Sequence, residues 1–458
     1  MTKSGMTRRK FLYASGAAAT GLVAAACAPS TSAPSGTSAP SAALAATGTP
    51  RTPVTIDWWI GTGSSGIGGS QAAAQQMIEV FKKTEAGQWV TPRPNFLPDD
   101  GYSEKMTTVM GSGVGVPDVA SILNANWFPA ALDLRPLIAR DKFNTAQYSK
   151  IHWDTRCLYQ DKVIGLPSDV GATMYFYNTT LMDAKGIKYP EWGYTMDQFL
   201  NDATKISDRS KKVYGATIQT RIWRGEMFAF GARPFSDDGK TVAGYMNGPK
   251  TVQALQFTYD LARSGAVPTA AEFEVLRTEG TGPIDLFKTG RLGFAPLNNG
   301  QFQTVDQAGV KYGLVHNPQV PGVPIITNGW AIQIGIPAAS KNQEAAWEWL
   351  KWYAGEPGQR YLQNLNKGFT GAIPAYWKEH PAANDARVKF FHRILETDMV
   401  WAFAGRFPYF NNVAALNQDL YDRIYLDKVK RSDIQSELDK VVPAAQKLVD
   451  DERKKLGL

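Results

Sequence analysis

Residues 54–122 alternate between strand-like and helix-like patterns, and no other feature of the sequence constrains the fold as strongly. The segment from Val54 to Ile60 is rich in β-branched and aromatic residues, as strands are. After Ser70, apolar residues recur at helical spacing as far as Phe81, and Gly87 is expected to end this helix. The alternation continues with a strand, a helix and a strand, expected at 89–96, 102–110 and 116–122. This order predicts a parallel α/β sheet.

The rest of the chain continues to mix the two kinds of element. An aromatic strand is expected at 163–178, and the tail over 416–456 reads as largely helical. Capping-box spacing at Thr195–Gln198 and again at Ser340–Gln343 predicts two helix starts. A further helix is expected at 252–262, and short strands at 287–294, 312–318 and 329–334.

The first 27 residues have the layout of an export signal. A basic start, with Arg8 and Arg9 at its centre, precedes an apolar run of about 16 residues, shorter than the roughly 20 needed to cross a bilayer. The paired arginines followed by Phe-Leu resemble a twin-arginine signal. The small residues before Cys27 resemble a lipoprotein processing box, in which Cys27 is acylated. Such boxes usually carry Leu where Ala24 stands, so cleavage without lipidation remains an alternative.

Composition narrows the class of protein further. A chain of 458 residues predicts at least two domains, preceded by a flexible Ala/Pro/Ser/Thr tether over 28–52. The net charge is +7, but the first 26 residues contribute four positive charges and no negative ones. The remaining +3, without a long basic run, argues against nucleic-acid binding. Cys157 is the only cysteine besides Cys27, which predicts a fold without disulfides and a buried thiol.

A glycine loop at Gly61–Gly66 matches the G-x-G-x-x-G pattern of dinucleotide sites and stands between a strand and a helix. The helix starts only after Gly69, which leaves its N-terminus far from a pyrophosphate. The preceding strand is crowded by Trp58 and Trp59, and an acid is missing at the expected distance of about 20 residues. We interpret the loop as ligand-facing. An exported NAD(P)-dependent oxidoreductase remains the alternative.

Catalytic patterns are sparse in this sequence. The four histidines are scattered without the i, i+4 spacing of a helix-borne zinc site, and no G-x-S-x-G elbow occurs. We therefore predict no catalytic residues, no metal and no cofactor. A secreted carbohydrate-active enzyme stays a third option, because the fold and not the spacing brings glycosidase carboxylates together.

Several short motifs then point to one family. They are Trp58-Trp59, Gly113–Val119, Gly165–Pro167 with Tyr177-Asn178, Pro190–Phe199, Phe287–Phe294, and Gly329-Trp330 with Ser340–Leu350. Together they make residues 53–450 resemble the extracellular solute-binding lipoproteins of bacterial carbohydrate ABC importers, the class that includes maltose-binding protein. Gly329-Trp330 departs from the commoner Gly-Gly of that class.

The resemblance implies an α/β fold of two lobes, with a hinge and a ligand cleft between them. The first lobe would span 53–168 plus 330–372 and the second 169–329 plus 373–458, with crossings near 166–171 and 327–330. It also implies a sugar ligand, ABC permease subunits as partners, and a monomer anchored by lipid on the outer face of the cytoplasmic membrane. The sugar would be captured by lobe closure and passed to the permease.

A sugar offers an apolar face that stacks on an aromatic ring and an edge of hydroxyls that need hydrogen-bond partners. Aromatic and polar residues near strand ends are therefore the candidates, and the family places stacking aromatics before the C-terminal helices. The predicted ligand-binding residues are Trp59, Asn124, Asn126, Trp127, Asp169, Trp223, Glu226, Asn298, Asn299, Trp330, Tyr409 and Phe410.

Overall fold

The computed structural model describes residues 51–61, 70–218, 222–223, 225–364, 371–399 and 407–456. The expected export signal with Cys27 and the tether up to residue 50 lie outside these residues. So do residues 62–66 of the glycine loop.

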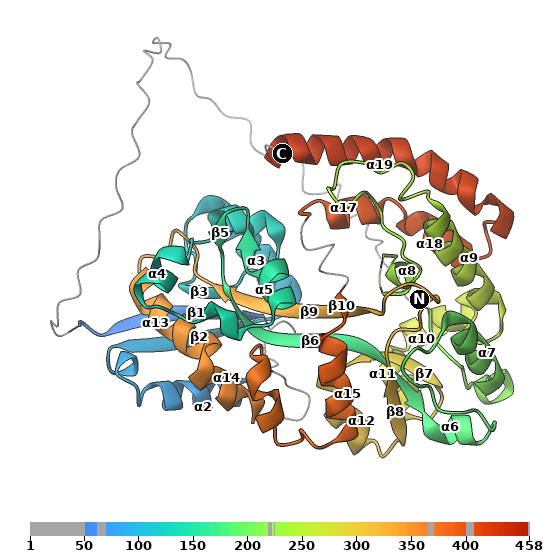
Figure 1. The fold of residues 1–458 in the computed structure, drawn as a ribbon, viewed down its shortest axis with the longest axis horizontal. Coiled ribbons are helices and arrows are strands. Elements are labelled where there is room, and N and C mark those ends of the chain that lie inside the picture. The colour runs from blue at the N-terminus through green and yellow to red at the C-terminus, as the bar shows by residue number, and fades with distance from the viewer. Residues whose placement is uncertain are drawn as a thin grey trace, which may run out of the picture. The chain divides into compact units, whose positions relative to one another are not determined.

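Three parallel strands form one half of the main sheet (Figure 1). β1 (Val54–Gly61) pairs with β2 (Val90–Leu97) on one side and with β3 (Val119–Ser121) on the other. The connecting helices are α2 (Gln71–Phe81) and α3 (Asp99–Ser112). The parallel α/β sheet predicted from the alternation is confirmed for this half. We call the part of the protein built on β1, β2 and β3 the first lobe.

Two long strands continue the sheet into a second lobe. β6 (Leu166–Asn178) and β9 (Ile326–Gly335) pair antiparallel, and β9 also pairs with β3. Beyond them, β7 (Phe294–Asn298) and β8 (Tyr312–Val315) both pair with β6. The strand order is β2-β1-β3-β9-β6-β7, so one sheet runs through both lobes. We call β6 and β9 the crossing strands and the part built on β7 and β8 the second lobe.

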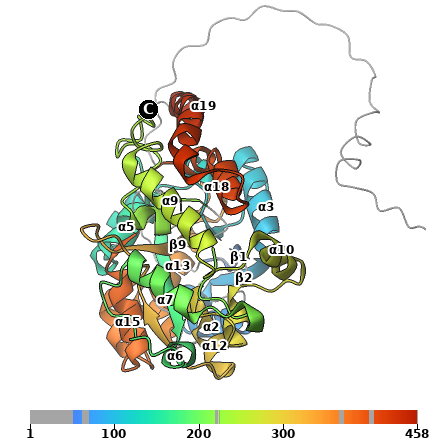
Figure 2. The ribbon, with the colours of Figure 1, turned by 90° about the vertical axis from the view of Figure 1, so that its right-hand side faces the viewer.

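Helices cover this sheet. In the second lobe α9 (Pro249–Arg263), α18 (Gln418–Tyr425) and α19 (Ile434–Leu456) pack against one another (Figures 1 and 2). Within the described residues, no helix is both long and apolar enough to cross a membrane. The remaining helices are α4 (Arg135–Arg140), α5 (Lys150–Arg156), α6 (Thr179–Asp183), α7 (Met196–Ile206), α8 (Gly225–Ala229), α10 (Ala270–Thr278), α11 (Pro283–Lys288), α12 (Phe302–Gln307), α13 (Gln343–Ala354), α14 (Glu356–Gln363), α15 (Ala386–Leu395) and α17 (Phe410–Ala415). Short strands are β4 (Leu158–Tyr159), β5 (Lys162–Val163) and β10 (Asp398–Met399).

The core of the first lobe is aromatic where α13 packs on the sheet. Trp58 of β1 meets Trp349 edge-to-face, with ring centroids 5.1 Å apart, and Tyr353 at 5.3 Å. Phe81, at the end of α2, adds another edge contact to Trp349 at 5.0 Å. Such pairs are worth about 0.5–1.5 kcal/mol each beyond the area they bury. These aromatic contacts hold α13 against the sheet of the first lobe, and α13 also packs against both β6 and β9.

Three local predictions are corrected. Residues 287–294 do not form a strand, because Pro283 opens helix α11, which reaches Lys288 before a turn leads into β7. Ser340 does not cap α13: Asn342 occupies the N-cap, and the Ser340 hydroxyl donates to Asp118 instead. The helix after Ser70 ends at Phe81, before Gly87.

The other capping box is confirmed. The Thr195 hydroxyl accepts a hydrogen bond from the backbone N–H of Gln198, and the Gln198 side chain accepts one from the backbone N–H of Thr195. Cys157 is fully buried, as predicted for a small apolar side chain.

Candidate ligand-binding site

The crossing strands have one covered face and one open face. Val170, Ala172 and Met174 of β6 are fully buried in the core cluster that also contains residues of α13 and α15. Because side chains alternate along a strand, the residues between them lie on the opposite face. α5 also packs against both crossing strands, and α8 packs against β9.

The open face carries one aromatic and several polar side chains. Trp330 and Asn328 of β9 are half-buried, as are Asp169 and Thr173 of β6. Thr173 is the register partner of Asn328, and Gly171 is the register partner of Trp330. Register partners on antiparallel strands lie on the same side of a sheet. We call this group, Asp169, Thr173, Asn328 and Trp330, the crossing site.

Asp169 contributes an unusual carboxyl group to the crossing site. It follows an irregularity in the register at Pro167, where β6 carries an extra residue relative to β9. Burial raises the pKa of the Asp169 carboxyl to about 8, although the backbone N–H of Val170 lowers that pKa by donating a hydrogen bond. Near pH 7 the group is mostly protonated, so it can donate a hydrogen bond to an oxygen of a ligand as well as accept one.

Two asparagines extend the crossing site into the second lobe. Asn298, at the end of β7, is the register partner of Thr173 on the other edge of β6. Its side chain accepts a hydrogen bond from the backbone N–H of Gly300 at 2.9 Å and so shapes the turn that follows. Asn299 is buried, and its side-chain oxygen accepts from the backbone N–H of Ala172 at 3.1 Å. The structure therefore brings the predicted residues Asp169, Asn298, Asn299 and Trp330 together.

A second group of predicted residues lines a pocket of about 170 Å³ between the two lobes. Asn124 caps the turn of residues 125–130 by accepting from the backbone N–H of Asn126 at 3.0 Å. Trp127 donates through its indole N–H to the Thr107 hydroxyl at 3.1 Å. Phe410, at the start of α17, closes the pocket from the second lobe. Asn126 is exposed and is not part of the pocket lining.

Three predicted aromatics are buried in the lobe cores. Trp59 is 6% exposed, and the Lys105 ammonium lies 4.3 Å from the centroid of its ring. Tyr409 is fully buried and donates to the carbonyl of Gly239 at 2.7 Å. Trp223 is 2% exposed. These rings support the lobes in this structure, and a direct contact with ligand stays a prediction for each of them.

Glu226 lies beside the crossing strands. The hydroxyl of Tyr175, two residues beyond Thr173 on the same face of β6, donates to Glu226 at 2.6 Å. Tyr175 is itself 1% exposed. The pair ties the short helix α8 to β6 at the second-lobe edge of the site.

Sequence reasoning missed three residues of these sites. Thr173 and Asn328 lie inside strands, where strict alternation along the strand is the signal that would have identified them. Arg156 of α5 lines the pocket between the lobes; burial lowers its pKa to about 10, so it remains charged near neutral pH. A single arginine in a short helix carries no sequence signal for a cleft.

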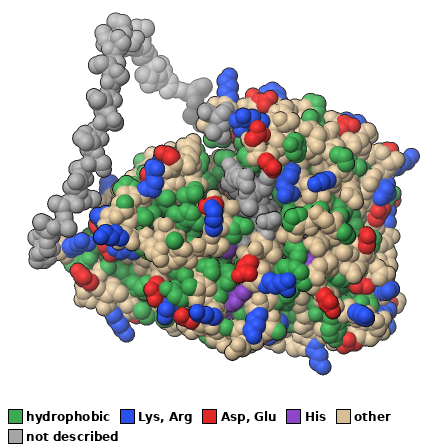
Figure 3. Space-filling view, viewed as in Figure 1, with side chains coloured by type: hydrophobic (Ala, Val, Ile, Leu, Met, Phe, Trp, Pro, Cys, Tyr) green, Lys and Arg blue, Asp and Glu red, His purple; other side chains and the backbone are tan. Residues whose placement is uncertain are grey.

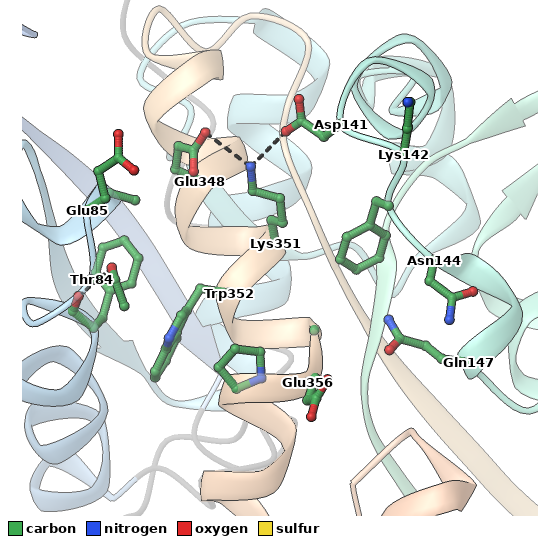
Figure 4. A pocket seen from close by; sticks show the side chains of 15 residues that line it. Thr84, Glu85, Asp141, Lys142, Asn144, Gln147, Glu348, Lys351, Trp352 and Glu356 are labelled. Carbon is green, nitrogen blue, oxygen red and sulfur yellow. Dashed lines mark hydrogen bonds and ion pairs between the residues drawn. The ribbon is translucent and has the colours of Figure 1, made fainter.

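Another pocket, of about 460 Å³, lies in the first lobe between α2, α13 and the loop after α4 (Figure 4). Lys351 lies between Asp141 and Glu348 there, with nitrogen–oxygen distances of 2.7 and 3.2 Å. The Asp141 carboxylate also accepts from the indole N–H of Trp347 at 2.8 Å. Because these charged groups already pair with one another, the crossing site is the better candidate for a ligand.

Basic and acidic side chains are interspersed over the visible face, without a large patch of one sign (Figure 3). Over the part of the chain that the structure describes, no group of three or more His, Cys, Asp or Glu side chains is placed to hold a metal ion.

Comparison with known proteins agrees with this geometry. Residues 65–360 match the family model of the bacterial extracellular solute-binding proteins, and this match covers more than half of the chain. The chain belongs to this family. Its members bind solutes and are not enzymes.

The chain is also similar to the arabinooligosaccharide-binding proteins of Halalkalibacterium halodurans and Bacillus subtilis. It is 26% identical to the first over 177 residues, which are 36% of this chain and 37% of that protein. It is 26% identical to the second over 202 residues, 41% of this chain and 43% of that protein. The matches thus span well under half the length of these relatives.

Among solved structures, the chain is similar to an ABC substrate-binding protein from Listeria monocytogenes in complex with cycloalternan. The TM-score is 0.71 with 19% sequence identity, and the match covers 89% of this chain and 100% of that one. Likeness at this level of identity concerns the fold. It confirms the predicted α/β fold of two lobes with a hinge and a cleft between them.

Proposed function

We propose that this protein is the substrate-binding component of an ABC-type carbohydrate uptake system. It captures a sugar or oligosaccharide in the cleft between its lobes, closes around it, and delivers it to the transmembrane subunits of a permease. The observation that carries the proposal is the crossing site, where the half-buried ring of Trp330 lies among Asp169, Thr173 and Asn328. An aromatic ring surrounded by hydroxyl, amide and carboxyl groups matches the apolar face and polar edge of a pyranose or furanose.

The identity of the relatives supports this ligand class. Two of them are arabinooligosaccharide-binding proteins, and one solved structure of similar fold is in complex with cycloalternan. We propose a neutral sugar, read by hydrogen bonds rather than by ion pairs. The remaining predicted residues, Asn124, Trp127, Glu226, Asn298 and Phe410 among them, would form its walls.

The domain and anchoring assignments are part of the same proposal. The lobes would divide at the predicted boundaries, with the first spanning 53–168 plus 330–372 and the second 169–329 plus 373–458. Acylation of Cys27, after export by the twin-arginine route, would hold a monomeric protein at the outer face of the cytoplasmic membrane. Replacing Cys27 by Ala should release the protein from the membrane fraction of cells, and retention of the variant would contradict lipid anchoring.

A thermal-shift screen of purified residues 28–458, without the lipidated Cys27, tests the ligand class. The panel contains arabino- and malto-oligosaccharides, monosaccharides, polyols, sugar phosphates and NAD(P). A ligand that binds only the folded state stabilises it by about 2.7 kcal/mol at a hundredfold excess over Kd. A shift with one sugar family and none with NAD(P) supports the proposal. A shift with NAD(P) and with no sugar would overturn it and favour the oxidoreductase alternative.

A further inference from the structure

Gly171 and Trp330 face each other across the crossing strands. They are direct register partners on β6 and β9, and both lie on the open face. A Cβ atom placed on Gly171 would stand 2.3 Å from Cζ2 and 2.5 Å from Cε2 of Trp330. The indole ring of Trp330 therefore lies directly against the backbone of β6, in space that any other residue at position 171 would fill.

Asn299 limits the same space from the second lobe. Its Oδ1 atom would be 2.8 Å from the Gly171 Cβ position, and it is held by the backbone N–H of Ala172 at 3.1 Å. Trp330 thus rests on a surface whose other atoms are fixed by main-chain hydrogen bonds.

The backbone itself does not require a glycine at position 171. Gly171 lies within the regular strand β6 and does not have the positive φ that glycine alone adopts easily. A glycine inside a strand weakens it and commonly marks a close approach by another group. Here the approaching group is the Trp330 ring.

We propose that Gly171 is a positioning residue of the ligand site, which lets Trp330 lie flat on β6 and present its other side to the ligand as a stacking platform. The inference rests on the proposed function and deepens it. It assigns the sugar's apolar face to Trp330, at the junction of the two lobes.

Four variants test this role: Gly171→Ala, Trp330→Ala, the double variant, and Gly165→Ala as a matched control. Gly165 also approaches β9 closely, with its Cβ position 2.8 Å from the Ile334 carbonyl oxygen, but it does not contact Trp330. Arabinotriose and maltotriose binding is measured by calorimetry, and folding is checked by the melting temperature. We expect Gly171→Ala to weaken binding at least tenfold, while Gly165→Ala leaves the affinity within twofold of wild type.

The double variant separates positioning from a general loss of stability. If Gly171 acts through Trp330, the double variant binds no more weakly than Trp330→Ala alone, because the two substitutions remove the same interaction. Fully additive losses would overturn the inference.

A second readout needs no sugar. In protein labelled with 5-fluorotryptophan, the ¹⁹F resonance of Trp330 is identified by its absence from Trp330→Phe. We expect Gly171→Ala to shift this resonance and Gly165→Ala to leave it in place. An unmoved resonance in Gly171→Ala would overturn the positioning role, whereas a shifted resonance together with a wild-type protein that binds neither sugar would refute the proposed ligand class instead.

Discussion

The buried carboxylate of Asp118 accepts a hydrogen bond from the hydroxyl of Ser340 at 2.7 Å, joining positions separated by 222 residues. The second oxygen of Asp118 accepts from the backbone N–H of Asp57 at 2.8 Å, and the amide of Asn342 reaches both oxygens at 3.3 Å. One side chain thereby ties the start of β3 to β1 and to the residues just before α13.

Replacing Asp118 by Ala should lower the free energy of unfolding by about 2–4 kcal/mol, because it leaves buried donors without an acceptor. The control is Asp57→Asn, which breaks an ion pair with Arg93 between side chains that are 39% and 68% exposed. Exposed pairs contribute about 0–1 kcal/mol. Chemical denaturation measures both, and equal losses in the two variants would contradict the role of Asp118.

Two histidines, the buried His152 and the half-buried His392, should make the protein sensitive to acid. Burial lowers the pKa of His152 to about 3 and that of His392 to about 4, with further lowering from Arg156 and His380 respectively. The unfolded chain takes up protons near pH 6.5, before the folded state does, so stability should fall as the pH drops below about 6.5. Denaturation midpoints at pH 7.5, 6 and 5 measure the slope.

Neither ring nitrogen of His152 has a hydrogen-bond partner in the described structure. His152→Leu therefore removes the titrating group without removing a hydrogen bond. This variant should lose less stability than wild type between pH 7.5 and 5. An unchanged slope would assign the acid sensitivity to other groups.

Asp169 should make both binding and stability depend on pH in the opposite direction. The folded state keeps a proton on Asp169 up to about pH 8, whereas an unfolded chain releases it near pH 3.8. Stability from this group is therefore full in acid and declines as the pH rises towards 8. A ligand that accepts a hydrogen bond from the neutral carboxyl should bind more weakly above pH 8.

Asp169→Asn keeps a neutral donor at this position. Its sugar affinity should be independent of pH between 6.5 and 9, and its stability above pH 8 should exceed that of wild type. Calorimetric titrations across this range test the first expectation. A wild-type affinity that stays flat through pH 8 would contradict hydrogen-bond donation by Asp169.

Cys157 should resist alkylation while the protein is folded. It is fully buried, and burial raises the pKa of its thiol well above the usual value, so little thiolate is available. Mass spectrometry after treatment with iodoacetamide at pH 8 should find the thiol unmodified in native buffer and fully modified in denaturant. Rapid modification of the native protein would show that α5 opens locally.

Helices and strands with a local sequence pattern could be predicted from the sequence. Strand pairings and hydrogen bonds that depend on distant parts of the chain could not. The alternation after Val54 predicts the parallel strands, because each crossover helix carries its own periodicity. The antiparallel pairing of β9 with both β3 and β6 has no local signature, since it joins segments more than 150 residues apart. Ser340 shows the same limit. The Ser340–Gln343 spacing matches a capping box, but the Ser340 hydroxyl donates its hydrogen bond to the distant Asp118 carboxyl group.

The residues of the candidate site likewise differ in whether the sequence could identify them. Trp330 and Asp169 could be chosen as candidates because both stand at the crossings that the family resemblance implies, near 327–330 and 166–171. Thr173 and Asn328 could not be chosen, because their place depends on which side of each strand faces the core. The burial of Tyr409 depends on packing against α19 and the Gly239 turn, and no residue near it in the chain indicates this.

The continuity of β6 and β9 through both lobes has a mechanical consequence. The two strands are hydrogen-bonded to each other from Leu166 to Thr173, so they form a ribbon that must bend as one body when the angle between the lobes changes. In the proposed closure, the contacts that a ligand makes with both lobes would therefore have to supply the free energy that bends this ribbon, and the lobes would be free to separate once those contacts are lost.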